Sequence, residues 1–322
     1  MDLSSRIAGL RINPAIMNAS GILSFAPVLK KISEFKIGAL VTKSACYDGK
    51  EGFENPIIAK CSDEAWLNAV GLPNSGCESK RKELEEAYPH FKSIGKPLIA
   101  SLFESSDEKM GKAIALLDNV CDAFEMNFSC PNLMPDEKTG MVIGRDPALV
   151  KKYTRAAKEA TEKPIIIKLS PGPYIEDRER IKEIVLSAAS AGADAISSIN
   201  TVPGGMKIDI FAKKPVLTAK YGGLSGKVIK PIGIGCVYTI YEALQSSGYN
   251  IPIIGIGGIE TAEDIIEYVE AGASAVAIGT FLVGMRLEQI ENYLSFLVEN
   301  IQMLSKALGA NSLMELRGVA HE

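Results

Sequence analysis

Short apolar runs alternate with longer amphipathic segments along most of this chain. Nearly continuous apolar runs suit strands that are buried on both faces, and their alternation with helices is typical of a parallel α/β architecture. We expect eight such strands, at residues 38–44, 67–72, 97–103, 123–129, 164–170, 195–200, 252–257 and 275–279.

Several segments between these strands begin with residues that favour helix starts. Ser106, Asp146 and Thr261 stand at the starts of three amphipathic segments, and their side chains are suited to accept hydrogen bonds from the first backbone N–H groups of a helix. Pro147 suits the first helical position. Gly272 suits the residue just after the third helix, where a left-handed conformation is common.

Eight strands with intervening helices predict an α/β fold of the (β/α)8 TIM-barrel type. A doubly wound open sheet has the same alternation, but polar residues at the predicted strand ends favour the barrel. No proline-rich or low-complexity linker divides the chain, so we expect a single domain over residues 1–322. We expect the first twenty residues to form a lid over the barrel bottom and residues 201–226 to form an insertion at its C-terminal face.

Charge and cysteine positions narrow the classes of function. The chain has 35 basic and 39 acidic residues, and they form no basic stripe of the kind that nucleic acid requires. Its six cysteines lack a CxxC pair, which argues against a disulfide framework, a zinc site or an iron–sulfur site. No run approaches the roughly 20 apolar residues of a membrane span, and Arg6 and Arg11 interrupt any signal peptide. We therefore expect a cytoplasmic protein that binds no nucleic acid, membrane or metal.

Polar residues gather at the C-terminal ends of the predicted strands, where barrel enzymes carry their chemistry. Asn, Ser, Thr and Lys at these points indicate a polar ligand inside a mostly apolar cup. A lysine that ends a buried strand, such as Lys43 or Lys168, requires an anionic partner or a changed ionisation. These positions include Lys43, Ser44, Asn68, Asn127, Lys168, Asn200 and Thr201.

Two glycine-rich segments follow the last two predicted strands. GIGGIET at residues 255–261 and AIGTFLVG at residues 277–284 place small residues where barrels often bind phosphate through backbone N–H groups. Glycine lets the backbone approach phosphate oxygens closely. The same glycines would also serve if they only made tight turns between strand and helix.

A cysteine lies at the end of the fourth predicted strand, in EMNFSCPN at residues 125–132. Its position between Ser129 and Pro131 is unusual for a residue that only packs. Most cysteines in intracellular proteins are nevertheless small buried hydrophobic residues. Position alone therefore leaves open whether Cys130 is catalytic.

Together these motifs resemble those of the class 1 dihydroorotate dehydrogenases, and the resemblance covers essentially the whole chain. It implies an FMN-dependent oxidoreductase that oxidises dihydroorotate to orotate in pyrimidine biosynthesis, with Cys130 as the general base. The motifs, in family order, are NASG (18–21), TKS (42–44), NAVGLPN (68–74), NFSCPN (127–132), IIIKLSP (165–171), INT (199–201), GGLSG (222–226), GIGGIET and AIGT.

The resemblance also implies roles for individual residues. Lys168 would face the N1/C2 edge of the flavin ring, and Lys43 would suit the orotate carboxylate. The implied FMN contacts are Ser20, Gly21, Lys43, Ser44, Asn127, Lys168 and Ile199, with the phosphate on Gly226, Gly257, Gly258, Gly279 and Thr280. The implied substrate contacts are Lys43, Asn68, Gly71, Leu72, Asn127, Asn132, Asn200 and Thr201.

Three features depart from the family pattern or leave its details open. Ser101 stands where many relatives carry an asparagine near the flavin, and residues 133–144 follow no family pattern. The resemblance suggests a homodimer, or a heterotetramer with an FAD and iron–sulfur subunit that passes electrons to NAD. The segment GMVIGRDP favours this paired form, whereas GLPNSG is more similar to fumarate-using members.

Other functions would use the same residues differently. A flavin enzyme that acts on another pyrimidine would keep the FMN site and change the substrate. A lyase would use Lys168 to form a Schiff base with a phosphorylated carbonyl compound, which leaves Cys130 and the asparagines without a role. A regulatory barrel without catalytic activity would leave the whole polar set unexplained.

Overall fold

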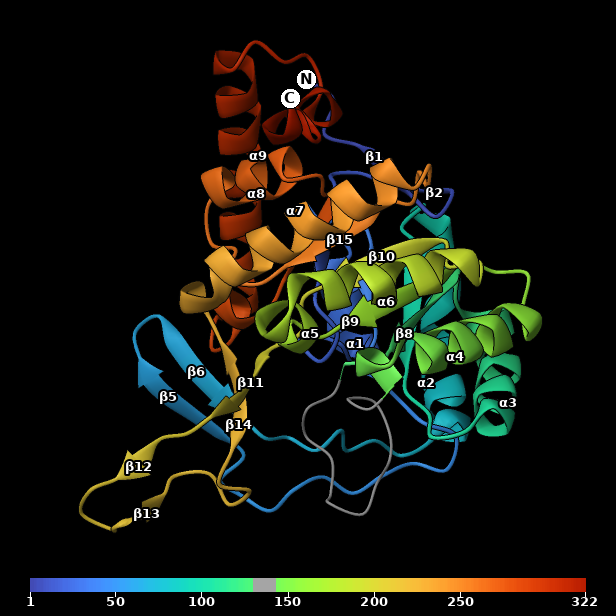
Figure 1. Ribbon diagram of the computed structural model, residues 1–322, viewed down its shortest axis with the longest axis vertical. Coiled ribbons are helices and arrows are strands. Elements are labelled where there is room, and N and C mark those ends of the chain that lie inside the picture. The colour runs from blue at the N-terminus through green and yellow to red at the C-terminus, as the bar shows by residue number, and fades with distance from the viewer. Residues whose placement is uncertain (130–142) are drawn as a thin grey trace.

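The computed structural model describes residues 1–129 and 143–322. A barrel of eight parallel strands forms its centre, with helices packed around the outside (Figure 1). The predicted (β/α)8 barrel is thereby confirmed. The order around the barrel is β3 (Ile16–Asn18), β16 (Ala275–Ile278), β15 (Ile253–Ile256), β10 (Ala195–Ser198), β9 (Ile165–Leu169), β8 (Ala123–Asn127), β7 (Leu98–Leu102) and β4 (Leu40–Val41).

The barrel closes between β3 and β4. Met17 and Ala39 form a parallel bridge, and the N–H of Gly38 donates to the carbonyl of Ile16 at 2.8 Å. Past this bridge, the side chain of Asn18 replaces the backbone ladder. Its amide accepts from the N–H of Val41 and donates to the carbonyl of the same residue, each at 2.9 Å.

One predicted barrel strand is wrong. Residues 67–72 were expected in the barrel, but β6 (Ala65–Asn68) pairs antiparallel with β5 (Ile58–Ser62) and β14 (Gly222–Ser225) in a separate sheet. The eighth barrel strand is β3, in the segment predicted to be a lid. The apolar run at 67–72 has a different cause, because Leu67 and Ala69 are buried in a small core that this separate sheet forms.

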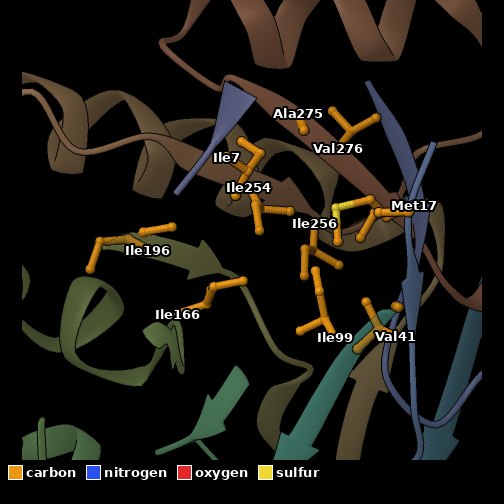
Figure 2. Close-up of a cluster of buried hydrophobic side chains, with 14 of the residues drawn as sticks. Ile7, Met17, Val41, Ile99, Ile166, Ile196, Ile254, Ile256, Ala275 and Val276 are labelled. Atoms are coloured by element: carbon orange, nitrogen blue, oxygen red, sulfur yellow. The ribbon is translucent and has the colours of Figure 1, made fainter. Parts of the chain in front are cut away.

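The lid prediction holds for the first part of the N-terminal segment. The hairpin of β1 (Ser5–Ile7) and β2 (Leu10–Ile12) buries Ile7 and Ile12 completely. Ile7 belongs to the same buried hydrophobic cluster as Ile254 and Ala275, near the beginnings of β15 and β16 (Figure 2). The hairpin therefore covers the end of the barrel where these strands begin.

Helix starts agree with the capping residues in the sequence. The side chains of Ser106, Asp146 and Thr261 accept hydrogen bonds from the first turns of α3, α4 and α8. Gly272 follows α8 with a φ of +115°. The helices are α1 (Ala26–Ile32), α2 (Cys77–Ser93), α3 (Asp107–Leu117), α4 (Pro147–Glu159), α5 (Gly172–Glu176), α6 (Arg178–Ser190), α7 (Lys230–Ser246), α8 (Ala262–Glu270) and α9 (Leu287–Ala307). Short 3-10 turns span Asp118–Val120, Ile143–Arg145, Lys227–Ile229, Thr280–Leu282, Leu313–Leu316 and Val319–His321.

The predicted insertion after the sixth predicted strand forms strands of its own. β11 (Val202–Gly205) and β14 join β6 and β5 in a four-stranded sheet. The hairpin of β12 (Ile208–Asp209) and β13 (Lys214–Pro215) projects from this sheet, away from the barrel (Figure 1). In the part of the chain that the structure describes, no helix has the length and hydropathy of a membrane-crossing segment.

The barrel interior changes from apolar to polar along its axis. Strand neighbours in register share a face, so Ile99, Ile166 and Ile254 face inward in the lower part (Figure 2). Two residues further along their strands, Ser101 and Lys168 face inward. The core therefore ends below the C-terminal ends of the strands, where the polar residues lie.

Candidate functional site

A cavity of about 260 Å³ lies between the C-terminal ends of the barrel strands and the four-stranded sheet. Residues from Ala19 to Val283 line it. Every predicted cofactor or substrate residue within the described ranges is part of this lining. These residues are Ser20, Gly21, Lys43, Ser44, Asn68, Gly71, Leu72, Asn127, Lys168, Ile199, Asn200, Thr201, Gly226, Gly257, Gly258, Gly279 and Thr280.

Two predicted residues cannot be placed in this cavity from the structure. Cys130, the predicted base, and Asn132, a predicted substrate contact, lie outside the described residues. Ser129, the neighbour of Cys130, is described and completely buried.

One end of the cavity consists of glycine-rich backbone. Within residues 1–129 and 143–322, the N–H groups of Gly258, Gly279 and Thr280 donate to no protein acceptor. Gly226 has a φ of +99°, and a Cβ there would lie 2.3 Å from the carbonyl oxygen of Glu64. Free donors on closely packed glycine backbone fit a phosphate group.

The wall beside this end is largely apolar. Ile199, Ile229 and Ile256 come from the barrel side, while Trp66 and Ile58 come from the four-stranded sheet. Apolar side chains on both sides suit a flat ring that is removed from water. Together with the glycine-rich end, this wall fits a phosphorylated ring compound such as FMN.

Serine side chains form the polar wall opposite. The hydroxyl of Ser20 donates to the carbonyl of Thr42 and lies 3.1 Å from the Oγ of Ser44. Ser44 Oγ is in turn 2.8 Å from Ser101 Oγ. Ser101, which departs from the family pattern, is absent from the described cavity lining and lies behind Ser44. It therefore supports the wall rather than forming its surface.

A buried ion pair lies at the base of this wall and was missed in the sequence. Glu125 Oε1 is 3.6 Å from Lys168 Nζ, and both side chains are about 5% exposed or less. Ser101 donates to Glu125 Oε1 at 3.1 Å, and Ser197 donates to Oε2 at 3.3 Å. The available signal was strand parity, because Glu125 lies two residues before Asn127 and must share its inward face.

The asparagines of the site are held by further hydrogen bonds. Asn127 Oδ1 accepts from both the N–H and the hydroxyl of Ser129, at 3.2 Å and 2.8 Å. Asn200 Nδ2 donates to Ser129 Oγ at 2.8 Å, and its Oδ1 accepts from the N–H of Thr201. Asn68 Nδ2 donates to the carbonyl of Gly223 at 3.3 Å. Fixed amides of this kind present defined donors and acceptors to a ligand.

Glu260 is a further lining residue that sequence reasoning missed. It lies shortly after Gly257 and Gly258, near the glycine-rich end of the cavity. Burial raises the pKa of its carboxyl group, and nearby Lys227 partly opposes this effect. Among the described residues, no group of three or more His, Cys, Asp and Glu side chains is arranged to hold a metal ion.

Comparison with known proteins gives the same family for the whole chain. A profile of the dihydroorotate dehydrogenase family matches residues 2–295. The chain is 37% identical over 321 residues to dihydroorotate dehydrogenase B (NAD(+)), catalytic subunit, of Pyrococcus abyssi, covering 99% of both chains. It is 38% identical to the protein of that name from Thermococcus kodakarensis, covering 99% and 98% of the chains.

A third relative carries a different acceptor in its name. The putative dihydroorotate dehydrogenase A (fumarate) of Aquifex aeolicus is 36% identical over 324 residues and is covered over 99% of its length. Family profile, relatives and cavity agree. The chain belongs to the dihydroorotate dehydrogenase family, whose members are flavin-dependent oxidoreductases acting on CH–CH groups.

Proposed function

We propose that this chain is the FMN-containing catalytic subunit that oxidises dihydroorotate to orotate in pyrimidine biosynthesis. The observation that carries the proposal is the cavity itself, because residues from nine separated sequence motifs line it. Cofactor, substrate and base would thus meet at the C-terminal end of one barrel. This arrangement uses residues 1–322 as one functional domain.

The cavity lining supports the following contacts for FMN. The N–H groups of Gly258, Gly279 and Thr280 would bind the phosphate. Ser20, Ser44, Asn127 and Lys168 would contact the polar edges of the ring. When bound, FMN supplies the acceptor for the hydride that leaves the substrate.

The remaining polar lining would bind dihydroorotate. Lys43 would pair with its carboxylate, and Asn68, Asn127 and Asn200 would hydrogen-bond its amide groups. Formation of the ring double bond also requires a base that removes a proton from the neighbouring carbon. Cys130 has this role in the proposal, which for this residue rests on the NFSCPN motif.

The names of the relatives support a partner subunit. The Pyrococcus and Thermococcus proteins are called catalytic subunits of an NAD(+) enzyme. We infer that this chain passes electrons to an FAD and iron–sulfur subunit, in a heterotetramer built on a homodimer of the catalytic chain. We place the assembly in the cytoplasm, where pyrimidine precursors and NAD are available.

The test is a visible absorption spectrum of the purified protein, before and after dihydroorotate is added without oxygen. We expect an oxidised-flavin spectrum that bleaches on addition. A flavin spectrum that stays unchanged would keep the cofactor and move the substrate to another pyrimidine. A colourless protein that takes up no added FMN would contradict the proposal.

The same experiment distinguishes the proposed flavin enzyme from the lyase alternative. A Schiff base requires an uncharged amine, whereas Lys168 lies 3.6 Å from the buried carboxylate of Glu125. The ion pair occupies the amine on which the Schiff base would have to form. A lysine adduct that borohydride traps in a colourless protein would nevertheless establish the lyase.

A further inference from the structure

A chain of buried hydrogen bonds links the substrate side of the cavity to Glu125. It runs from Asn200 through Ser129, Asn127, Ser44 and Ser101, with distances of 2.8, 2.8, 3.4, 2.8 and 3.1 Å along the way. Ser197 and Lys168 reach the same carboxylate from the other side. Four of these residues, which are absent from the described cavity lining, support the lining residues from behind: Ser101, Glu125, Ser129 and Ser197.

The donor and the acceptor of each hydrogen bond in this series can be assigned, starting from the two asparagines. A backbone N–H can only donate, so the N–H of Thr201 identifies the atom of Asn200 that it reaches as oxygen. The N–H of Ser129 does the same for Asn127. The amide nitrogen of Asn200 therefore faces Ser129, and that of Asn127 faces Ser44.

Each serine hydroxyl has one hydrogen to donate, so a serine that accepts from one neighbour in this series donates to the next. Ser129 accepts from Asn200 and donates to Asn127. Ser44 accepts from the Asn127 amide and donates to Ser101, which in turn donates to Glu125. The chain must end on a group that only accepts, and an ionised carboxylate is such a group.

We infer that Glu125 is a positioning residue of the active site, whose buried carboxylate terminates the hydrogen-bond chain that holds the Asn127 amide and keeps the Lys168 amine beside the cavity. This inference rests on the proposed function, because it concerns groups that would meet the flavin and the pyrimidine. Glu125 itself is absent from the described cavity lining. It acts through Ser101 and Lys168, so its two effects are separable by mutation.

Glu125→Gln tests the effect on Lys168. The Lys168 amine loses its ion-pair partner and is no longer held beside the cavity. A cation beside the flavin favours the reduced form. In the holoenzyme, the midpoint potential of bound FMN should therefore be lower in Glu125→Gln than in the parent, measured by dye equilibration, whereas loss of the carboxylate charge alone would raise it.

Ser101→Ala tests the effect on Asn127, because it interrupts the chain and leaves the ion pair in place. Ser44 loses its acceptor, and we expect orotate to bind about fivefold to tenfold more weakly, as measured by the change that orotate causes in the flavin spectrum. The midpoint potential of the flavin should match that of the parent. Ser197→Ala removes a hydrogen bond to the same carboxylate but lies off the chain, so orotate binding should stay within about twofold of the parent.

Ser198→Ala is the matched control, since Ser198 is an equally buried neighbour whose hydroxyl contacts Cys236 instead. It should match the parent in both measurements. An unchanged or higher midpoint potential in Glu125→Gln would overturn the role at Lys168, and unchanged orotate binding in Ser101→Ala would overturn the role at Asn127. If Glu125→Gln does not retain FMN, the comparison of Ser101→Ala with Ser197→Ala still decides the second role. A parent enzyme that dihydroorotate bleaches keeps the proposed function in either case.

Discussion

At the scale of single residues, Glu104 links ionisation to stability. It lies two residues after β7 and is 6% exposed, with the N–H of Tyr47 donating to its carboxylate. Burial raises the pKa of this carboxyl group from its usual value to about 7. The folded state therefore binds the proton more tightly than the unfolded state does, and the free energy of unfolding decreases as pH rises from about 4.5 to about 7.

Glu104→Gln removes this ionisation at nearly constant shape. We expect the variant to be more stable than the parent at pH 8, by at most about 3 kcal/mol, and to gain almost nothing at pH 4. Urea unfolding at the two pH values measures the difference. Glu108→Gln, at an exposed position of α3, is the control and should change little at either pH. An equal change at both pH values for Glu104→Gln would show that ionisation is not the cause.

The predicted role of Cys130 as the catalytic base rests on the sequence alone. A free thiol titrates near ~8.5, and only the thiolate removes a proton efficiently. The rate at which dihydroorotate bleaches the flavin should therefore rise with pH on the alkaline side. Cys130→Ala should lose most of this rate while the protein keeps its FMN, as stopped-flow absorbance would show.

Ser129 is the neighbour that could be mistaken for the base. Its hydroxyl already donates to Asn127 and accepts from Asn200, so Ser129→Ala should cost less of the bleaching rate than Cys130→Ala. A rate that is flat between about pH 6 and pH 9 would count against a thiolate base.

At the scale of elements, the side chain of Asn18 joins its own strand, β3, to β4 and so closes the barrel. Its fully buried amide makes both hydrogen bonds to the backbone of Val41, where β3 and β4 lack a ladder. Asn18→Ala leaves a buried N–H and a buried carbonyl without partners. We expect a loss of about 2–4 kcal/mol in the free energy of unfolding, measured with urea.

Asn300→Ala is the control for Asn18→Ala, because the Asn300 amide donates to a helix carbonyl at the surface. Its effect should stay within about 0.5 kcal/mol. A similarly small effect for Asn18→Ala would mean that packing, rather than this side chain, closes the barrel.

Strand β3 is also the barrel strand that was not predicted from the sequence. Seven barrel strands could be predicted because long apolar runs need burial on both faces. β3 follows Pro14 in a segment that was assigned to the lid, and β6 is apolar because the separate sheet has a core of its own. The cavity lining was predictable since motifs at strand ends meet in a barrel. Glu125 was not, because its meaning depends on Ser101 and Ser197, which pair with it only in three dimensions.

At the scale of the whole molecule, the open question is which acceptor takes the electrons from the reduced flavin. The chain has no CxxC pair, and its described residues hold no cluster of metal ligands. Under the proposed function, a second redox centre for transfer to NAD would belong to a partner subunit, as the names of the relatives called catalytic subunits suggest. The Aquifex relative is instead named for fumarate.

These two possibilities predict different behaviour for the isolated chain. After dihydroorotate has bleached the flavin without oxygen, we expect neither NAD nor fumarate to restore the oxidised spectrum. When the chain is produced together with an FAD and iron–sulfur subunit, dihydroorotate should drive NADH formation, which absorbance would follow. Recovery of the oxidised spectrum with fumarate, as fast as the bleaching, would instead show that small acceptors enter the same cavity and that the chain needs no partner for turnover.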